Sequence, residues 1–380
     1  MASTDKKDYF ENRFLEFSEK YIKDNYPEHI STGFEKFDEL LGGGLAPGLT
    51  VLGAISSLGK STFSLQLAQN ITKQGRPVIY YSLEMSKHAI AMKAIQRSAF
   101  KKSREKVKDL YTESGKKRII SYDAYEKLKK ESLSTIDLLN DLKSVPKKEK
   151  LKNSAVEECK KECDGRLFII ERDINTDAFS AKDILDDVES FRKKTGENPV
   201  VFVDYLQILI SSADKTHKTE KQIVDENIQN LWLVANQNQI PVFVISSVNR
   251  DSYSKSISFS SFKESGGIEF TADVVLGMQF SVLHGRKSEE KQAFNPDEEK
   301  GRDPRRVEVI VLKQRYGKSG SNAFDRFIYY PEFSYFEEGD ADVPIKFHDD
   351  EPAAEKKTEQ KTKSKSKTTT TTRGRKGKLV

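Results

Sequence analysis

The sequence predicts an α/β fold in which a mostly parallel β-sheet carries helices on both faces. Seven apolar runs have the length of a strand, and segments with helical character separate most of them. The runs are largely continuous rather than alternating, which is typical of strands buried on both faces. A sheet of such strands needs helices on each side. The predicted strands are residues 49–54, 77–83, 167–170, 199–206, 241–248, 274–280 and 307–312.

The length of the chain, 380 residues with 36% hydrophobic content, fits one large domain with small additions. We expect this domain to span residues 31–345. Within it, residues 100–165 are rich in lysine and show no strand pattern. We therefore predict a helical insertion there.

Both ends of the chain differ from the predicted domain. Residues 8–26 place Phe10, Phe14, Phe17 and Tyr21 at helical spacing, so residues 1–30 are predicted to form a linker helix. Its apolar stripe would pack either on its own core or on a neighbouring subunit. Residues 346–380 contain few large apolar side chains and are predicted to be a disordered basic tail.

Charge is unevenly distributed along the chain. Residues 351–380 hold ten Lys or Arg and three Glu, whereas the whole chain has a net charge of +5. Residues 1–350 are therefore slightly acidic, with a net charge of −2. Any DNA site in the main domain must be a local basic surface.

Other sequence signals point to a cytoplasmic protein without a membrane segment. No apolar run approaches the length of a membrane span, and the N-terminus lacks the apolar core of a signal peptide. Cys159 and Cys163 are four residues apart but lack the further Cys or His that zinc needs. We expect two reduced thiols.

The strongest motif directly follows the first predicted strand. Residues 54–62 read AISSLGKST, and a segment with helical character comes next. Strand, small-residue loop, Gly-Lys-Ser and helix form the context of a P-loop, although Ala54 replaces the first glycine of the general pattern. Backbone N–H groups would bind phosphates, Lys60 would reach the β and γ phosphates, and the Ser61 hydroxyl would bind Mg²⁺. The predicted nucleotide-binding residues are Ser57, Leu58, Gly59, Lys60, Ser61 and Thr62.

Two carboxylates lie at the ends of two other predicted strands, Asp204 in residues 199–206 and Glu84 directly after residues 77–83. Asp204 has the oxygen ligands that Mg²⁺ prefers, so it is predicted to join Ser61 at the metal, although an aspartate there is also a common turn former. Glu84 is placed to polarise the water that attacks the γ-phosphate. The alternative for Glu84 is a charge at the N-terminus of a helix near Ser86.

Seven blocks between roughly residues 30 and 335 resemble the helicase domain of DnaB-type replicative helicases. The matching blocks are more similar to the helicase regions of plasmid, phage and other mobile-element replication proteins than to those of the chromosomal enzymes. The resemblance implies a RecA-like ATPase fold, ATP and Mg²⁺ as cofactors, and a homo-oligomer, expected to be a hexameric ring, on single-stranded DNA. The blocks are residues 32–45, 54–62, 81–85, 203–209, 245–250, 262–275 and 312–320.

The resemblance also implies catalytic roles. Lys60 and Ser61 look like the phosphate and Mg²⁺ groups, Glu84 like the catalytic base and Asp204 like the carboxylate that positions the metal. Lys313 and Arg315 resemble the basic pair that one subunit inserts into the ATP site of its neighbour. Alternate residues of a strand share a face, so both could point at one phosphate group. The alternative is an exposed strand end.

A further block resembles the loop that grips single-stranded DNA. Its Gly-Gly pair would free backbone amides to meet phosphates, and Lys263 would add charge. The alternative is a loop that is merely mobile. Candidate DNA-binding residues are Lys263, Glu264, Ser265, Gly266 and Gly267, with Arg250 and Lys255 from the preceding segment.

The chain departs from the family at two points. Ser247 stands where chromosomal relatives carry a glutamine that senses the γ-phosphate, and nothing in this sequence resembles the family's N-terminal helical collar. Three functions therefore stay open. The first is a helicase that unwinds DNA during replication of a mobile element with a separate primase or initiator. The others are a regulatory or recombination ATPase that binds DNA without unwinding it, and a non-catalytic DNA-binding module that uses the basic tail.

Overall fold

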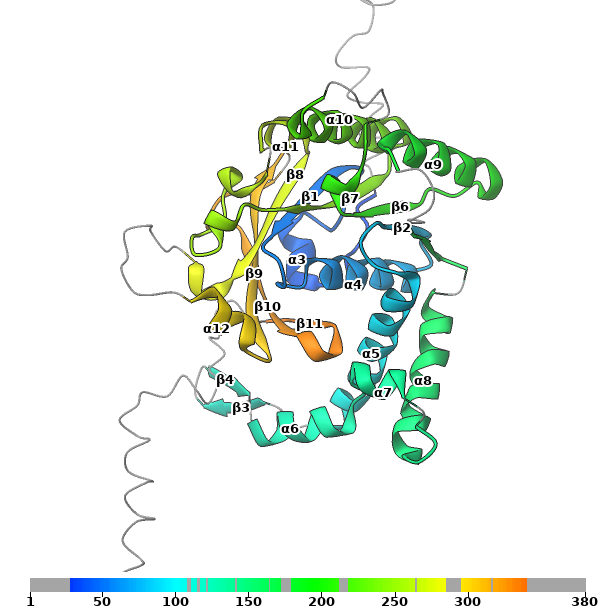
Figure 1. Cartoon of the computed structure of the whole chain (residues 1–380), viewed down its shortest axis with the longest axis vertical. Helices are drawn as coiled ribbons and strands as arrows, with labels where there is room; N and C mark the ends of the chain where they lie inside the picture. Colours follow the sequence, from blue (N-terminus) through cyan, green and yellow to red (C-terminus); the bar gives the residue numbers. More distant parts are fainter. Residues whose placement is uncertain are drawn as a thin grey trace, which may run out of the picture.

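A nine-stranded β-sheet runs through the protein in the order β11-β10-β9-β8-β1-β7-β6-β2-β5 (Figure 1). This computed structural model describes residues 28–339 apart from 108–110, 115–116, 121, 141, 164, 172–178, 212–217, 264, 285–294 and 316. The strands of the sheet are β1 Gly48–Ala54, β2 Val78–Ser82, β5 Leu167–Glu171, β6 Val200–Asp204, β7 Pro241–Ser247, β8 Val274–Phe280, β9 Arg305–Gln314, β10 Phe324–Tyr330 and β11 Tyr335–Glu338.

Parallel pairing dominates the sheet. The strands from β8 through β1, β7, β6 and β2 to β5 are parallel, whereas β9, β10 and β11 extend it in antiparallel pairs. All seven predicted strands form, and the prediction of a mostly parallel α/β fold is confirmed. The sequence did not predict β10 and β11, because β10 mixes half-buried and buried positions and β11 has only four residues.

Helices cover both faces of the sheet (Figure 1). One face packs against α3 (Glu35–Leu40) and α4 (Lys60–Lys73). The other packs against α9 (Ala181–Thr195), α10 (Glu220–Asn238) and α11 (Ser265–Thr271). Successive side chains of β1 alternate between the two cores, because strand residues point to opposite faces in turn.

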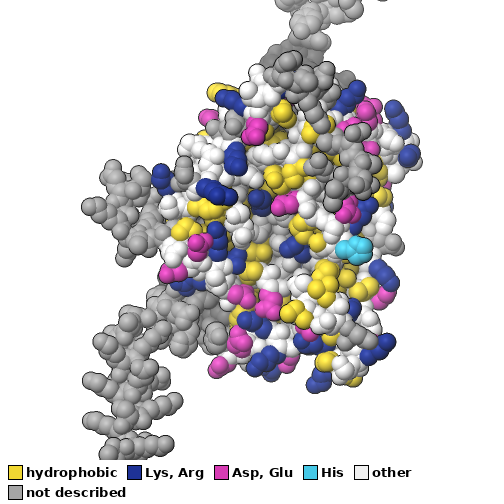
Figure 2. All heavy atoms as spheres, viewed as in Figure 1, with side chains coloured by type: hydrophobic (Ala, Val, Ile, Leu, Met, Phe, Trp, Pro, Cys, Tyr) yellow, Lys and Arg dark blue, Asp and Glu magenta, His cyan; other side chains and the backbone are white. Residues whose placement is uncertain are grey.

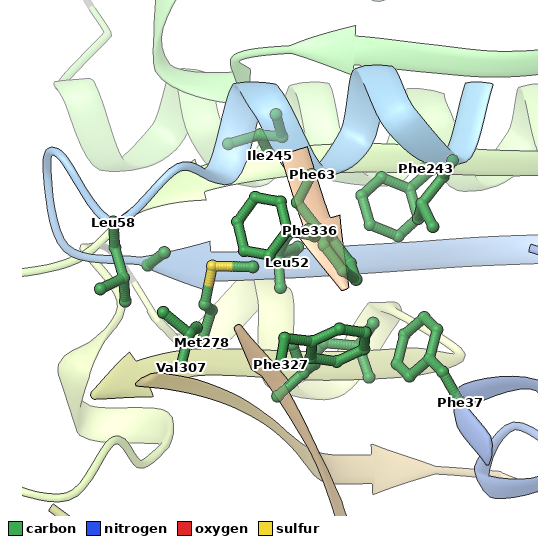
Figure 3. Packing of buried hydrophobic residues seen from close by; sticks show 14 of the residues in the cluster. Phe37, Leu52, Leu58, Phe63, Phe243, Ile245, Met278, Val307, Phe327 and Phe336 are labelled. Carbon is green, nitrogen blue, oxygen red and sulfur yellow. The ribbon is translucent and has the colours of Figure 1, made fainter. Parts of the chain in front are cut away.

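An aromatic cluster anchors the start of α4 (Figure 3). Phe63 is fully buried, and its ring centroid lies 5.2 Å from those of Phe327 and Phe336 and 5.7 Å from that of Phe37. Its contacts with Phe327, Phe336 and Phe37 are edge-to-face, a favourable arrangement for aromatic rings. The antiparallel strands β10 and β11 therefore hold the helix that follows the P-loop.

Residues 100–165 form a body beside the sheet in which helices predominate (Figure 1). The sequence predicted no strand here, but the structure has a short antiparallel sheet, whose strands of four residues each are too short to show a clear periodicity. The side chains of Phe100, Tyr125 and Leu128 pack against Tyr330 and Phe333 beside β10. The body is entered through α5, Lys87–Lys106, which begins before residue 100. Its other elements are β3 Tyr111–Ser114, β4 Lys117–Ile120, α6 Tyr122–Glu131, α7 Thr135–Leu139 and α8 Pro146–Cys163.

Other predictions concern the remaining parts of the chain. Residues 1–27 and 340–380 lie outside the described residues, so the linker helix and the basic tail stay predictions. Cys159 and Cys163 are both free thiols. In the portion that the structure describes, no helix combines the length and apolar content of a membrane span. A short helix, α12 (Pro296–Gly301), precedes β9.

Candidate active site

The P-loop connects β1 to α4 at the carboxyl end of the parallel strands. Gly59 has a φ of +91°, and a Cβ there would lie only 2.7 Å from Tyr329 Cζ. A larger residue is therefore excluded by both backbone conformation and space. Ser57 also has a positive φ, of 67°, and Leu58 is fully buried. The loop is thus fixed in a sharp turn that leads directly into the helix.

The first turn of α4 is suited to bind an anion. Gly59 caps the helix without a side-chain hydrogen bond, and the turn contains no acidic residue. Its N–H groups and the helix dipole are available to phosphate oxygens. The loop is braced from outside, because Arg305 Nη1 donates to the Ser57 carbonyl at 2.7 Å and Tyr253 Oη contacts Ser56 Oγ at 3.2 Å.

Asp204 ends β6 beside the P-loop and is only 1% exposed. Burial, followed by the charge of Glu84, raises the pKa of Asp204 to about 6, against the opposing effects of Ser61 and Lys60. Tyr80 Oη donates to Asp204 Oδ2 at 3.3 Å. The fold therefore brings together Lys60, Ser61 and Asp204, the side chains predicted to bind phosphate and metal.

The donor set at Asp204 fits Mg²⁺. Asp204 Oδ1 is buried and has no hydrogen bond of standard geometry among the described residues. The Ser61 hydroxyl is close enough to lower the pKa of the same carboxyl group. Mg²⁺ commonly takes one or two protein oxygens together with substrate phosphates and water. Ser61 and Asp204 would supply those protein oxygens.

Glu84 lies in the exposed loop between β2 and α5. Its charge raises the pKa of both Asp204 and Tyr205, which places it on the metal side of the site. Ser86 caps α5, since its Oγ accepts a hydrogen bond from the Ala89 amide at 3.2 Å. Glu84 therefore makes no capping bond to this helix, and its role as catalytic base stays a prediction.

Ser247 ends β7 and contacts a residue that the sequence analysis missed. Gln207 Oε1 accepts a hydrogen bond from the Ser247 amide at 3.1 Å, and Gln207 Nε2 donates to Ser246 Oγ at 2.9 Å. The fold thus sets a carboxamide beside Ser247, the position at which the family resemblance implies a glutamine. The signal was the glutamine three residues after Asp204, but only the pairing of β6 with β7 reveals the contact.

Lys313 and Arg315 lie together at the far end of β9, where they contact the C-terminus of α11. Lys313 Nζ donates to the Glu269 carbonyl at 2.6 Å, and Arg315 Nε pairs with Asp273 Oδ1 at 3.1 Å. Cations are favourable at a helix C-terminus. The Arg315 side chain is still 39% exposed. Lys313 is eight positions and Arg315 ten positions along the chain from Arg305 beside the P-loop, roughly 26 and 33 Å in an extended strand, so neither cation reaches the P-loop of its own subunit.

The candidate DNA residues are only partly arranged as predicted. Arg250, Lys255 and Lys263 are exposed, and the Lys263 amide donates to the Ser247 carbonyl at 3.4 Å. Glu264 lies outside the described residues. Figure 2 shows basic and acidic side chains interspersed over the face in view, in keeping with a local rather than a global basic field.

The glycine pair differs from the predicted loop. Ser265, Gly266 and Gly267 begin helix α11 instead of extending the loop. A Cβ on Gly267 would overlap the carboxylate of Asp225 in α10, whereas a Cβ on Gly266 would meet nothing within 4 Å. Gly267 therefore allows two helices to approach closely, which is a packing role that the sequence interpretation overlooked.

Comparisons with known proteins agree with this architecture. The family model of the DnaB-like helicase C terminal domain matches residues 29–145 and 139–338. The probable plasmid replicative DNA helicase of Chlamydia psittaci is 28% identical over 302 residues, which cover 78% of this chain and 53% of the relative. The chain spans about half the length of the curated relatives it matches.

Solved structures share the fold. An ATPase domain of known structure superimposes with a TM-score of 0.59 at 18% identity, covering 86% of this chain and 96% of that one. A DnaB-like replicative helicase, solved in a study of its interactions with primase, superimposes with a TM-score of 0.58 at 20% identity. The match covers 85% of this chain and 64% of that one. The family model matches most of the chain, and the resemblance seen in the sequence is confirmed: this chain belongs to the DnaB-like helicase C-terminal domain family.

Proposed function

We propose that this chain is the ATP-hydrolysing motor of a DnaB-type DNA helicase that moves on single-stranded DNA and unwinds duplex during replication of a mobile element. One observation carries the proposal. The P-loop, Asp204 and Glu84 meet at one end of the sheet, whereas half-buried Lys313 and exposed Arg315 lie at the opposite end. Each subunit would thus contribute the P-loop half of one active site and the cationic half of another. In a ring, every P-loop would then meet the Lys313 and Arg315 pair of its neighbour.

In the proposed mechanism, N–H groups of the P-loop and the Lys60 ammonium bind the phosphates of ATP. Mg²⁺ held by Ser61 and Asp204 would neutralise charge that develops on the phosphate oxygens. Glu84 accepts a proton from the attacking water, and Arg315 of the neighbouring subunit stabilises the transferring phosphoryl group. An arginine supplied in this way contributes roughly three to five powers of ten in rate in comparable enzymes.

Coupling to DNA would run through the end of β7. Gln207 lies against Ser247, and the Ser247 carbonyl accepts a hydrogen bond from the amide of Lys263. A shift at the γ-phosphate would therefore be passed to Lys263, which binds the DNA backbone. Exposed Arg250 and Lys255 would extend that contact. These contacts ignore base identity, as a translocating enzyme requires.

The proposal includes a cytoplasmic location, a hexameric ring and a separate primase or replication initiator as partner. The name of the plasmid relative supports a role in replication of a mobile element, and the structural neighbour studied with primase supports a primase partner. Glu264 stays a candidate DNA contact, and the basic tail would add loose affinity for polyanions.

Subunit mixing tests the shared site. Lys60→Ala and Arg315→Ala should each abolish hydrolysis stimulated by single-stranded DNA. An equimolar mixture should recover part of the activity, because some interfaces then combine an intact P-loop with an intact Arg315. Arg166→Ala, which removes an exposed cation paired with Glu197, is the matched control. Normal hydrolysis by Arg315→Ala, or a mixture as inactive as its parts, would contradict the proposal.

Strand displacement tests the unwinding step. The assembled protein should release a labelled strand from a forked duplex in the presence of ATP. Hydrolysis without displacement under conditions where rings form would favour an ATPase that binds DNA without unwinding it.

A further inference from the structure

Two cations of α5 lie behind the P-loop and have no part in the mechanism above. Lys93 and Arg97 are four residues apart and therefore share one face of the helix. Arg97 is only 2% exposed, and Lys93 is partly buried. Neither side chain forms a salt bridge within the part of the chain that the structure describes.

Both cations converge on Thr62, the residue after Ser61. Lys93 Nζ donates to Thr62 Oγ1 at 3.2 Å, and Arg97 Nη2 donates to the Thr62 carbonyl at 3.2 Å. The same side chains also hold Ser334, which immediately precedes β11, because Arg97 Nε donates to its carbonyl at 2.8 Å and Lys93 Nζ to its Oγ at 3.5 Å. Arg97 Nη1 further contacts Gln69 Oε1 in α4. The first turn of α4 is therefore tied to α5 and to β11.

The burial of these charges is costly without an anion. Burial lowers the pKa of Arg97 to about 10, and burial together with Arg97 lowers the pKa of Lys93. Asp204 is the carboxylate that counteracts the shift at Lys93. Both cations thus have neutral direct partners, and both hold the turn of α4 that directly follows the P-loop.

The position of α5 adds a second connection. The helix begins at Lys87, three residues after Glu84, and Ser86 caps it. A cation that fastens α5 to Thr62 therefore also fixes the distance between the Glu84 loop and the turn that carries Ser61.

We propose that Lys93 is a positioning residue of the nucleotide site, which with Arg97 holds Thr62 so that Ser61 faces Asp204 and favours a Mg²⁺-bound nucleotide. This inference rests on the proposed function and names the residues that shape its metal turn. It predicts a defect in Mg²⁺-dependent nucleotide binding rather than a general loss of folding.

Calorimetric titration of the full chain with ADP, with and without Mg²⁺, tests the role. Lys93→Met should weaken the binding of ADP with Mg²⁺ about 10- to 100-fold, the usual effect of losing a residue that orients a metal ligand. Binding of ADP without Mg²⁺ should change much less, and Lys93→Arg should restore the Mg²⁺ effect. Lys102→Met is the matched control, because Lys102 lies on the same helix but pairs with Glu158 at 2.7 Å, away from the P-loop.

Each outcome separates the inference from the proposed function. If Lys93→Met binds ADP with Mg²⁺ as tightly as the unaltered chain, or if Lys93→Arg is equally weak and both melt earlier than Lys102→Met, the positioning role is wrong. If Lys93→Met does not fold, Lys93→Ala takes its place, since it also removes the donor to Thr62 and should show the same loss of affinity for ADP with Mg²⁺. A chain that shows the Lys93 effect but no DNA-stimulated hydrolysis would contradict the proposed function alone.

Discussion

Arg305 and Arg315 lie at the two ends of β9, and only Arg305 touches the P-loop of its own subunit, where Nη1 meets the Ser57 carbonyl at 2.7 Å. Arg315 instead pairs with Asp273, at the opposite end of the strands. One strand thus places Arg305 against the P-loop of its own subunit and leads to Arg315, which is partly exposed at the other end. This division follows from the antiparallel direction of β9, which starts where the parallel strands end.

The two arginines should respond differently to subunit mixing. Arg305→Ala removes a brace of its own P-loop, so mixing it with Lys60→Ala should restore little hydrolysis, since both variants are damaged at the same site. Arg315→Ala mixed with Lys60→Ala should recover activity. Rates of phosphate release with single-stranded DNA measure both mixtures. Equal recovery in both would show that Arg305 does not act on its own loop.

Replacement of Asp204 by Asn should stabilise the nucleotide-free protein at neutral pH. Its folded pKa of about 6 lies above the unfolded value, so the folded state binds more protons between about pH 4 and 6 and loses stability as the pH rises through that range. At pH 7 the buried, ionised Asp204 lowers the free energy of unfolding by on the order of 3 kcal/mol. Thermal melts at pH 5 and 7 should show a gain for Asp204→Asn that is larger at pH 7.

The same variant should lose Mg²⁺-dependent nucleotide binding, since the metal requires the carboxylate. In the unaltered chain this binding should weaken as the pH falls below about 6, because protons then compete for Asp204. An affinity that stays constant from pH 7.5 to 5 would argue against Asp204 as a metal ligand.

Glu84→Gln should bind ATP and fail to hydrolyse it. Loss of a general base lowers the rate by about 10²- to 10⁴-fold, whereas phosphate contacts stay intact. The thermal stability should be unchanged, because Glu84 does not cap α5. Ser86→Ala provides the contrast, with a loss of about 1 kcal/mol in stability from the missing cap. Single-turnover hydrolysis and nucleotide titration separate the two effects.

Gly266 and Gly267 should differ sharply despite being adjacent. Gly267→Ala would force a methyl group against Asp225 and should cost about 1–3 kcal/mol. Gly266→Ala has open space around it and should be neutral or gain up to about 1 kcal/mol as a helix residue. Urea unfolding of both variants measures the difference. Equal destabilisation would mean that α10 and α11 pack otherwise.

Lys263→Ala should weaken binding of single-stranded DNA without affecting nucleotide affinity. Each phosphate contact contributes about −0.7 to the slope of log affinity against log salt, so the slope should become shallower by about that amount. Fluorescence anisotropy over a salt series measures it. Lys36→Ala is the control, since Lys36 Nζ donates to the Gly339 carbonyl beside β11. An unchanged slope would remove Lys263 from the DNA-binding surface.

Local signals account for what could be predicted. A strand, a Gly-Lys-Ser turn and a helix are contiguous, and continuous apolar runs mark buried parallel strands, so the P-loop, the sheet and the family can be predicted from the sequence. Asp204 and Glu84 could be singled out because the carboxyl ends of parallel strands meet at one edge. The hairpin β3 and β4 gave no comparable signal, because each of its strands has only four residues.

By itself, the sequence determined which groups are available: a P-loop motif, two carboxylates at strand ends and a pair of cations two residues apart. Only the tertiary structure decided how these groups are shared, since contacts such as Gln207 with Ser247 and Lys93 with Thr62 join residues 40 and 31 positions apart. Their formation depends on the order of the strands and the angle of α5. Local composition cannot encode that arrangement, because it arises from burying two apolar faces of one sheet at the same time.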